Sequence, residues 1–266
     1  MEATRPLTAD RVTSALVEDG VSLVKGLGAN ASTRTAGDAS LVITSVAVPT
    51  LNGVLTVRAT AAEQDVRVLL DIVARKDLPH SILLRPGCGN EVVRLAQRRG
   101  MVEDEPVPLM ALQLPSDRIR EGAQHAGLSI RILDPDEAGI HAAIAAEGFG
   151  APLEMFEELM PRGVLAQRGN RVYVGSVDGQ DVVTAFGSTS KDHVGIFNVA
   201  TPVAHRGRGY GTAITARAAL DGFNSGATFA YLQSSPAGLR IYESLGFRIL
   251  ETWTVWVTPP AQPPVA

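Results

Sequence analysis

The chain has few of the features that would place it in a membrane, at a metal centre or in an oxidising compartment. Cys88 is its one cysteine, so a disulfide framework is excluded, and no Cys/His pairs stand at the spacing of a zinc site. No apolar run approaches a membrane span, and the amino terminus lacks the basic-then-apolar order of a signal peptide. We therefore expect a cytoplasmic protein with no bound metal and no membrane partner.

The chain also lacks an excess of charge of one sign. It has 24 basic and 28 acidic residues, for a formal net charge of −4, and the two signs are mixed along the sequence. This balance gives no electrostatic reason to expect nucleic acid as a partner. With 266 residues, the chain is long enough to bury a core in one large domain or two of common size.

Helical and strand patterns alternate along the chain, which favours an α/β or α+β fold with a mixed sheet over a bundle or a sandwich. Asp134-Pro135 predicts a helix start, and Asp178-Gly179 predicts a hairpin turn between two strands. Helices are predicted after Thr8 and at 61–75, 90–99, 134–146 and 152–160, and strands at 41–48, 54–57, 81–84, 109–112, 129–133, 171–177, 182–188, 193–200 and 228–233.

A glycine-rich turn between the strand at 193–200 and a following helix is the most informative segment. Gly207, Gly209 and Gly211 stand at alternate positions, where the missing Cβ atoms let successive backbone N–H groups converge on one oxyanion. The following helix adds its own unpaired N–H groups and its dipole. The segment therefore predicts an anion-binding loop.

Two common phosphate loops do not fit this spacing. A P-loop needs a lysine and a serine or threonine after its last glycine, whereas Gly211 is followed by Thr212 and Ala213. A dinucleotide fingerprint needs a glycine at the sixth position, and counting from Gly207 that position is Thr212. A nucleotide-binding module is therefore disfavoured.

The pattern Arg-x-x-Gly-x-Gly at Arg206, Gly209 and Gly211 resembles the acetyl-CoA pyrophosphate loop of the GCN5-related N-acetyltransferases (GNAT). Residues 230–247 resemble a later segment of that family, in which a strand, a small-residue turn and a helix with a tyrosine are followed by Leu-Gly-Phe. The tyrosine is Tyr242, and Gly246 ends the helix. The resemblance covers roughly residues 127–258.

The resemblance implies acetyl-CoA as acyl donor and a primary amine as acceptor, on a small molecule or a protein. The amine attacks the thioester directly, through a tetrahedral oxyanion and without a covalent enzyme intermediate. Tyr242 is the expected general acid toward the leaving thiolate. The expected acetyl-CoA contacts come from the strand end, the glycine loop and the later turn, at Asn198, Val199, Ala200, Thr201, Arg206, Gly207, Arg208, Gly209, Tyr210, Gly211, Thr212, Ser235 and Ala237.

A general base is not identified by the sequence. Glu147, the pair Asp192-His193 acting through water, and His205 are open alternatives to a surface or structural role, and a water chain can replace a single base. Cys88 is expected to be structural. The acceptor substrate and a homodimer are also left open.

The first half of the chain resembles a second copy of the same plan. With an offset of 146 residues, Gly100-Met101 matches Gly246-Phe247, and Tyr242 falls on Ala96. Residues 57–60, before the first copy's helix, contain no glycine. We therefore expect two tandem GNAT-like domains, each a mixed, mostly antiparallel sheet flanked by helices: 1–115 degenerate, 116–127 a linker, 128–258 the acetyltransferase, and 259–266 a disordered tail. The function alternative is a non-catalytic acyl-CoA sensor.

Overall fold

The computed structural model describes residues 6–259, which form two compact units, each built from two separate stretches of chain. Unit 1 takes residues 6–19 and 108–250, and unit 2 takes residues 20–107 and 251–259. Helix α1 (Ala9–Leu27) therefore contributes its first part to unit 1 and the rest to unit 2. The domain boundaries expected from the sequence stay a prediction. Of the expected disordered tail, residues 260–266 lie outside the described residues.

Unit 1 contains a mixed sheet in the strand order β5-β10-β9-β8-β7-β6. The pair β9 and β10 is parallel, and its neighbours pair antiparallel. The strands are β5 (Val102–Gln113, of which the part from Pro108 belongs to unit 1), β6 (Ser129–Ile132), β7 (Asn170–Val177), β8 (Gln180–Ser190), β9 (His193–Ala200) and β10 (Phe229–Gln233).

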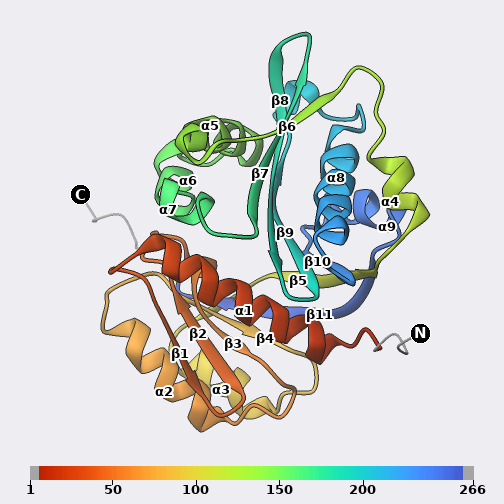
Figure 1. Cartoon of the computed structure of the whole chain (residues 1–266). Coiled ribbons are helices and arrows are strands. Elements are labelled where there is room, and N and C mark those ends of the chain that lie inside the picture. Colours follow the sequence, from red (N-terminus) through yellow and green to blue (C-terminus); the bar gives the residue numbers. More distant parts are fainter. Residues whose placement is uncertain (1–5, 260–266) are drawn as a thin grey trace. The chain divides into compact units, whose positions relative to one another are not determined.

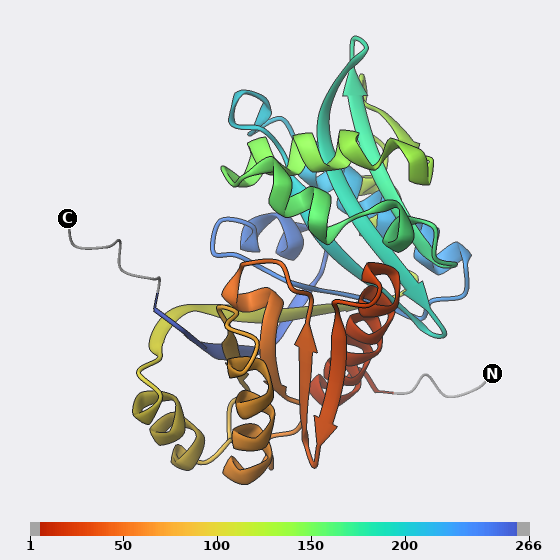
Figure 2. The same cartoon turned by 90° about the vertical axis from the view of Figure 1, so that its left-hand side faces the viewer.

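Helices cover both faces of this sheet. Figure 1 shows α8 (Tyr210–Asn224), with α4 (Asp117–Gly122) and α9 (Leu239–Ser244), on one face. The opposite face carries α5 (Ala138–Phe149), α6 (Leu153–Leu159) and α7 (Arg162–Leu165), which lie across β7 and β8 in Figure 2. The expected α/β class with a mixed sheet is confirmed.

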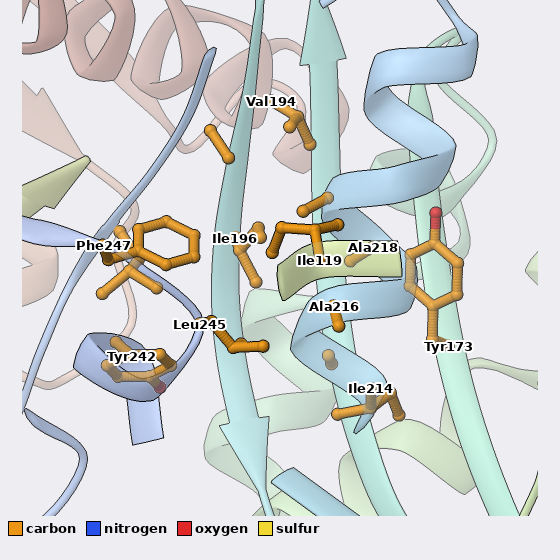
Figure 3. Packing of buried hydrophobic residues seen from close by; sticks show 14 of the residues in the cluster. Ile119, Tyr173, Val194, Ile196, Ile214, Ala216, Ala218, Tyr242, Leu245 and Phe247 are labelled. Carbon is orange, nitrogen blue, oxygen red and sulfur yellow. The ribbon is translucent and has the colours of Figure 1, made fainter. Parts of the chain in front are cut away.

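The main core of unit 1 lies between the sheet and α8. Small residues of α8 pack on the apolar side chains of β9, so the helix approaches the sheet closely. Figure 3 shows Ile214, Ala216 and Ala218 of α8 near Ile196, with Tyr242, Leu245 and Phe247 from α9 and the segment after it in the same cluster. The core thereby fixes α8 and α9 against the sheet.

Two local signals in the sequence have the expected structures. The Asp134 carboxylate accepts a hydrogen bond from the Asp136 amide at 3.0 Å, and Glu137 accepts one from the Asp134 amide at 2.9 Å. This reciprocal cap begins the short turn η2 (Pro135–Glu137) that leads into α5. Asp178 and Gly179, at the turn between β7 and β8, both have positive φ angles of 50° and 82°.

Unit 2 repeats the plan on a smaller scale, with the strand order β1-β2-β3-β4-β11 and one parallel pair, β3 and β4. Its buried cluster joins these strands to α2 and α3. The expected strand at 41–48 is shorter, because a turn and the 3₁₀ helix η1 (Pro49–Leu51) follow Ile43. The remaining elements are β1 (Ser32–Ala36), β2 (Ala39–Ile43), β3 (Asn52–Thr56), α2 (Glu63–Ala74), β4 (Ser81–Leu84), α3 (Asn90–Arg98) and β11 (Arg248–Val257, of which the part from Glu251 belongs to unit 2).

Candidate active site

The glycine-rich loop joins β9 to α8 and presents a row of free amide donors. A 3₁₀ turn, η3 (Val203–His205), uses the Arg206 amide, which donates to the Val203 carbonyl at 3.2 Å. The next six amides, those of residues 207–212, donate to no acceptor within residues 6–259, and the first helical bond runs from the Ala213 amide to the Gly209 carbonyl. Residues 207–209 are exposed, Gly211 and Thr212 are half-buried and Tyr210 is buried. All six donors lie at or just before the start of α8, the positive end of the helix dipole.

Glycine is required at two positions for this arrangement. Gly207 and Gly209 have φ angles of 76° and 83°, in the left-handed region that other residues adopt at a cost. A Cβ at Gly207 would meet nothing within 4 Å, so the space above the loop is open. Gly209 is the N-cap of α8, and no acidic residue occupies the first turn of the helix. The loop therefore has the geometry and the charge to bind an anion.

Side chains from distant segments hold the loop in place. The Arg206 guanidinium donates to the Thr201 carbonyl at 3.0 Å and to the Gly148 carbonyl at the end of α5. His125 Nε2 lies 2.8 Å from the Arg208 carbonyl, and its ring lies edge-on to Tyr210 with 5.2 Å between centroids. Sequence reasoning missed His125 and Gly148, because neither lies in the motif and no local pattern marks them.

The strands beside the loop part from each other. Paired residues of β9 and β10 end at Gly195 and Tyr231, although β9 continues to Ala200 and β10 to Gln233. A bulge in the pairing of β8 and β9 falls at Asn198, whose φ is 49°. Such a bulge takes backbone groups out of the ladder and bends the strand. The end of β9 thus has an edge without a β10 partner, directly before the anion-binding loop.

Tyr242 lies on α9, on the same face of the sheet as α8. Its side chain is buried in the core cluster, and its ring lies 6.2 Å from that of Phe247. Burial raises the pKa of Tyr242 to about 12. The hydroxyl is therefore protonated at neutral pH and can donate a proton or a hydrogen bond.

The turn that precedes α9 is short and closed by its own backbone. The Ser234 hydroxyl and the Gly238 amide both donate to the Ser235 carbonyl, at 2.7 and 3.0 Å. Ser235, Pro236 and Ala237 are exposed. The structure thus leaves the predicted contact residues Ser235 and Ala237 accessible.

The other titratable candidates lie on other elements than Tyr242. Glu147 is exposed on α5, and His205 is half-buried in η3. His193 is buried at the start of β9. A further histidine, His141 of α5, is fully buried against Thr184, with Nδ1 2.7 Å from the Thr184 hydroxyl, and burial lowers its pKa to about 4.

The described part of the chain has neither a cluster of metal-ligating side chains nor a helix that could span a membrane. Residues 6–259 contain no group of three or more His, Cys, Asp or Glu side chains arranged to hold a metal ion. Each helix in that range is too short or too polar to cross a bilayer.

The structure brings most of the predicted site residues into one contiguous region of unit 1. The strand end, the loop and the first turn of α8 form its continuous part, and the core joins α9 to it. Tyr210 is buried in this core. The region comprises Asn198, Val199, Ala200, Thr201, Arg206, Gly207, Arg208, Gly209, Tyr210, Gly211, Thr212 and Tyr242.

No protein-family model matches the chain, and no curated protein matches it by sequence. Solved structures do match over nearly its full length. A GCN5-related N-acetyltransferase from Kribbella flavida aligns with a TM-score of 0.67 and 22% identity, covering 95% of this chain and 96% of that one. The fold is that of the GCN5-related N-acetyltransferases.

Two further GNAT structures agree with this result. A tandem GNAT protein from the clavulanic acid biosynthesis pathway aligns with a TM-score of 0.57 and 15% identity over 97% of this chain and 98% of that one. A GCN5-related N-acetyltransferase from Sphaerobacter thermophilus aligns with a TM-score of 0.58 and 16% identity over 83% and 80%. The resemblance seen over roughly residues 127–258 is therefore confirmed at the level of the fold.

Proposed function

We propose that unit 1 is an acetyl-CoA-dependent N-acetyltransferase that acts on a primary amine. The observation that carries the proposal is the run of six free amides at residues 207–212, placed at the start of α8 and next to the parted strands. In this chain they supply what a diphosphate needs: several free N–H groups at a helix start, open space above Gly207 and no acidic residue in the first turn of α8.

The donor would be held at two places. The amides of residues 207–212 bind the pyrophosphate, and each hydrogen bond to a charged oxygen contributes about 1.5–3 kcal/mol. The free edge of β9, ahead of Pro202, pairs with the pantetheine arm as an added strand pairs with a sheet edge. Arg206 acts here mainly through its bonds to the Thr201 and Gly148 carbonyls, which fix the loop.

The chemistry requires an amine without its proton and a proton for the departing sulfur. Acetyl-CoA supplies an activated carbonyl carbon and a thiolate leaving group. Tyr242 is the proposed donor toward the sulfur. A thiol has an ordinary pKa of about 8.5 and the Tyr242 pKa is about 12, so complete transfer from Tyr242 is uphill. We therefore expect Tyr242 to donate a hydrogen bond to the developing thiolate. It passes its proton to the sulfur only as the attacking nitrogen gives up a proton that restores the tyrosine hydroxyl, so the products are the amide and the free thiol.

Calorimetry with coenzyme A, combined with thiol release from acetyl-CoA across a panel of amines, tests the proposal. We expect binding with one site per chain, and thiol release that depends on at least one amine. Binding without thiol release for any amine would favour the non-catalytic acyl-CoA sensor. Absence of coenzyme A binding would overturn both functions, since both require the loop to hold the diphosphate.

A further inference from the structure

The peptide bond between Arg208 and Gly209 lies in the middle of the glycine-rich loop. Its carbonyl oxygen, that of Arg208, lies 2.8 Å from His125 Nε2. A carbonyl oxygen only accepts, so the imidazole is the donor and carries a hydrogen on Nε2. The carbonyl and the N–H of a trans peptide point in opposite directions, so the Gly209 amide points away from His125. This amide is one of the six that have no acceptor within residues 6–259.

The backbone angles of Gly209 also permit the opposite orientation of this peptide. Gly209 has φ 83° and ψ 0°, the angles of the third residue in a type II turn. A type I turn places that residue at a φ of about −90° with a similar ψ, and the two turns differ by a half-turn of the preceding peptide. Glycine adopts both signs of φ with similar ease. Gly209 therefore allows either orientation and does not by itself choose between them.

The two orientations have opposite consequences for a bound anion. In the observed one, the Gly209 N–H is free and adds a donor to the run of amides at residues 207–212. In the opposite one, the Arg208 carbonyl would stand where that N–H now stands. A carbonyl oxygen carries partial negative charge and repels a phosphate, whereas an N–H attracts it. One rotation of one peptide would thus exchange a donor for an acceptor in the middle of the loop.

Packed segments on both sides hold His125 in its place between α4 and β6. Before it, a Cβ at Gly122 would stand 3.2 Å from the Ala216 Cβ, so α4 lies closely against α8. After it, the Leu128 amide donates to the His125 carbonyl at 3.3 Å. The side chains of Ala123 and Leu128 both pack against the core of unit 1. The backbone that carries the imidazole is therefore fixed relative to α8.

The packing of the imidazole leaves Nε2 as its bonded nitrogen. The ring lies edge-on to the buried Tyr210, with 5.2 Å between centroids, and a Cβ at Gly209 would stand 3.3 Å from Nε2. The other nitrogen, Nδ1, is buried and has no hydrogen-bond partner in the part of the chain that the structure describes. A hydrogen on Nδ1 would find no acceptor there, whereas the hydrogen on Nε2 finds the Arg208 carbonyl. His125 is therefore a fixed donor toward the loop.

We infer that His125 is a positioning residue that locks the 208–209 peptide with its N–H free for the diphosphate. The inference rests on the function proposed above, in which the loop amides hold the diphosphate of acetyl-CoA. Turning the peptide over would break the bond between His125 and the Arg208 carbonyl and bring the Gly209 N–H toward the imidazole N–H. The lock thereby prepares the loop before the ligand binds, which lowers the cost of binding.

His125→Phe tests the lock, because it keeps an aromatic ring against Tyr210 and removes the N–H donor. We expect the Kd of coenzyme A in calorimetry, and the KM of acetyl-CoA, to rise by about 10-fold, the lower end of the effect of one lost hydrogen bond to a charged oxygen. The kcat should stay within about twofold, since the lock acts on donor binding and not on the reacting atoms.

Two variants serve as controls. His125→Gln retains an N–H donor at the end of its side chain, so the Kd of coenzyme A should stay within about threefold of wild type. His80→Phe is the matched loss in unit 2, where the half-buried His80 has Nδ1 2.9 Å from the Leu78 carbonyl. It removes the same kind of bond far from the loop in sequence and should leave the Kd unchanged.

A second acyl donor separates the lock from a general distortion of unit 1. S-acetylpantetheine carries the thioester and the pantetheine arm but no diphosphate, so the 208–209 peptide contributes nothing to its binding. Its kcat/KM in His125→Phe should stay within about twofold of wild type.

The orientation of the peptide can also be observed directly. A crystal structure of His125→Phe without ligand should show Gly209 at a negative φ, in place of the 83° of the wild-type chain.

The outcomes keep the lock distinct from the proposed function. A wild-type Kd in His125→Phe, an equal loss for acetyl-CoA and S-acetylpantetheine, or a positive φ retained at Gly209 would overturn the lock and leave the acetyltransferase intact. A His125→Phe protein that does not fold transfers the decision to His125→Ala, where a tenfold weaker Kd supports the lock and an unchanged Kd overturns it. A wild-type protein that does not bind coenzyme A would overturn both proposals.

Discussion

Units 1 and 2 follow the same order of strand, helix, parallel strand and helix, yet only unit 1 keeps its parallel strands apart at their ends. In unit 2, β3 and β4 pair up to Leu55 and Leu83. Beyond them the Arg85 amide donates to the Thr56 hydroxyl at 2.9 Å, and the Arg85 guanidinium donates to the Val57 carbonyl. In unit 2 the end of β3 is therefore bridged by the residue that follows β4.

Arg85 is itself fixed by an ion pair. Its Nε and Nη2 atoms donate to the two carboxylate oxygens of Glu251 at 2.8 and 2.7 Å, and the Trp253 indole donates to the same carboxylate at 2.9 Å. The Arg85 side chain is only 3% exposed. Where unit 1 has an open strand edge, unit 2 has a buried, hydrogen-bonded arginine.

The helix starts differ as sharply as the strand ends. In unit 1, Gly209 caps α8 with a left-handed conformation, and the first turn of the helix contains no acidic residue. In unit 2, Ala62 caps α2, and Glu63 and Asp65 lie in the first turn. Carboxylates at a helix N-terminus stabilise the helix but repel a bound phosphate. In the proposed function, these few residues distinguish the anion-binding loop of unit 1 from the helix start of unit 2.

Replacing the buried Arg85 of unit 2 should produce the largest effect on stability. In Arg85→Met, Glu251 loses its buried partner, and we expect the free energy of unfolding of unit 2 to fall by about 3 kcal/mol. Both tryptophans of the chain, Trp253 and Trp256, lie in unit 2, so their fluorescence in a urea titration reports this unit.

The exposed pair Arg94 and Glu91 on α3 provides the matched control for that experiment. Arg94→Met should cost less than about 0.5 kcal/mol, because exposed ion pairs contribute little. Coenzyme A affinity should not change in either variant. A loss below about 1 kcal/mol in Arg85→Met would mean that the ion pair does not stabilise the closed strands.

A carboxylate at Gly209 should make the start of α8 as acidic as the start of α2 in unit 2. In Gly209→Glu, the side chain adds like charge and the backbone must keep a positive φ of 83°. We expect coenzyme A affinity to fall by about 100-fold, or about 2.7 kcal/mol, in calorimetry. Gly209→Ala separates the backbone effect from the charge and should lose less.

Ala62→Glu is the matched change at the N-cap of α2 in unit 2, where the residue is exposed and has an ordinary φ of −77°. It should leave coenzyme A affinity unchanged. Equal losses from Ala62→Glu and Gly209→Glu would contradict the assignment of the ligand to unit 1.

The comparison can also be tested at Tyr242 of α9, because the 146-residue offset matches this tyrosine to Ala96 of α3 in unit 2. We expect Tyr242→Phe to lower kcat by about 10- to 50-fold, less than the usual loss for a general acid because a thiolate is a good leaving group. Coenzyme A affinity should stay within about twofold, since the ring is retained. Tyr173→Phe, a buried tyrosine of the same core outside the site, is the control. A kcat unchanged in Tyr242→Phe would remove the hydroxyl from the mechanism.

The sequence predicted the parts of the fold that depend on local patterns. The cap at Asp134 and the turn at Asp178-Gly179 were visible because the required residue types stand together in the chain. Gly100 and Gly246, matched by the offset, both have positive φ angles, of 69° and 93°, and each follows a helix. The strand β1 was missed because its residues are polar and none of them is buried.

Other features depend on contacts between distant residues, which no local pattern records. Asp19 meets Ser188 and Tyr231 across 169 and 212 positions. His125 supports the loop from a segment that was expected to be a linker. The pairing of β11 with β4 joins the end of the chain to its first half. Each of these contacts is set by the packed fold and not by its own stretch of sequence.

The exchange of chain segments between the two units has a consequence for synthesis on the ribosome. Unit 2 lies mostly in the first 107 residues, but its fifth strand, paired with β4 through residues 254–257, is made only after the whole of unit 1. The emerging amino-terminal half must therefore wait, with one side of β4 uncovered, until residues 254–257 have been made. Splitting the gene near its middle would yield two fragments, each missing a strand that the other encodes.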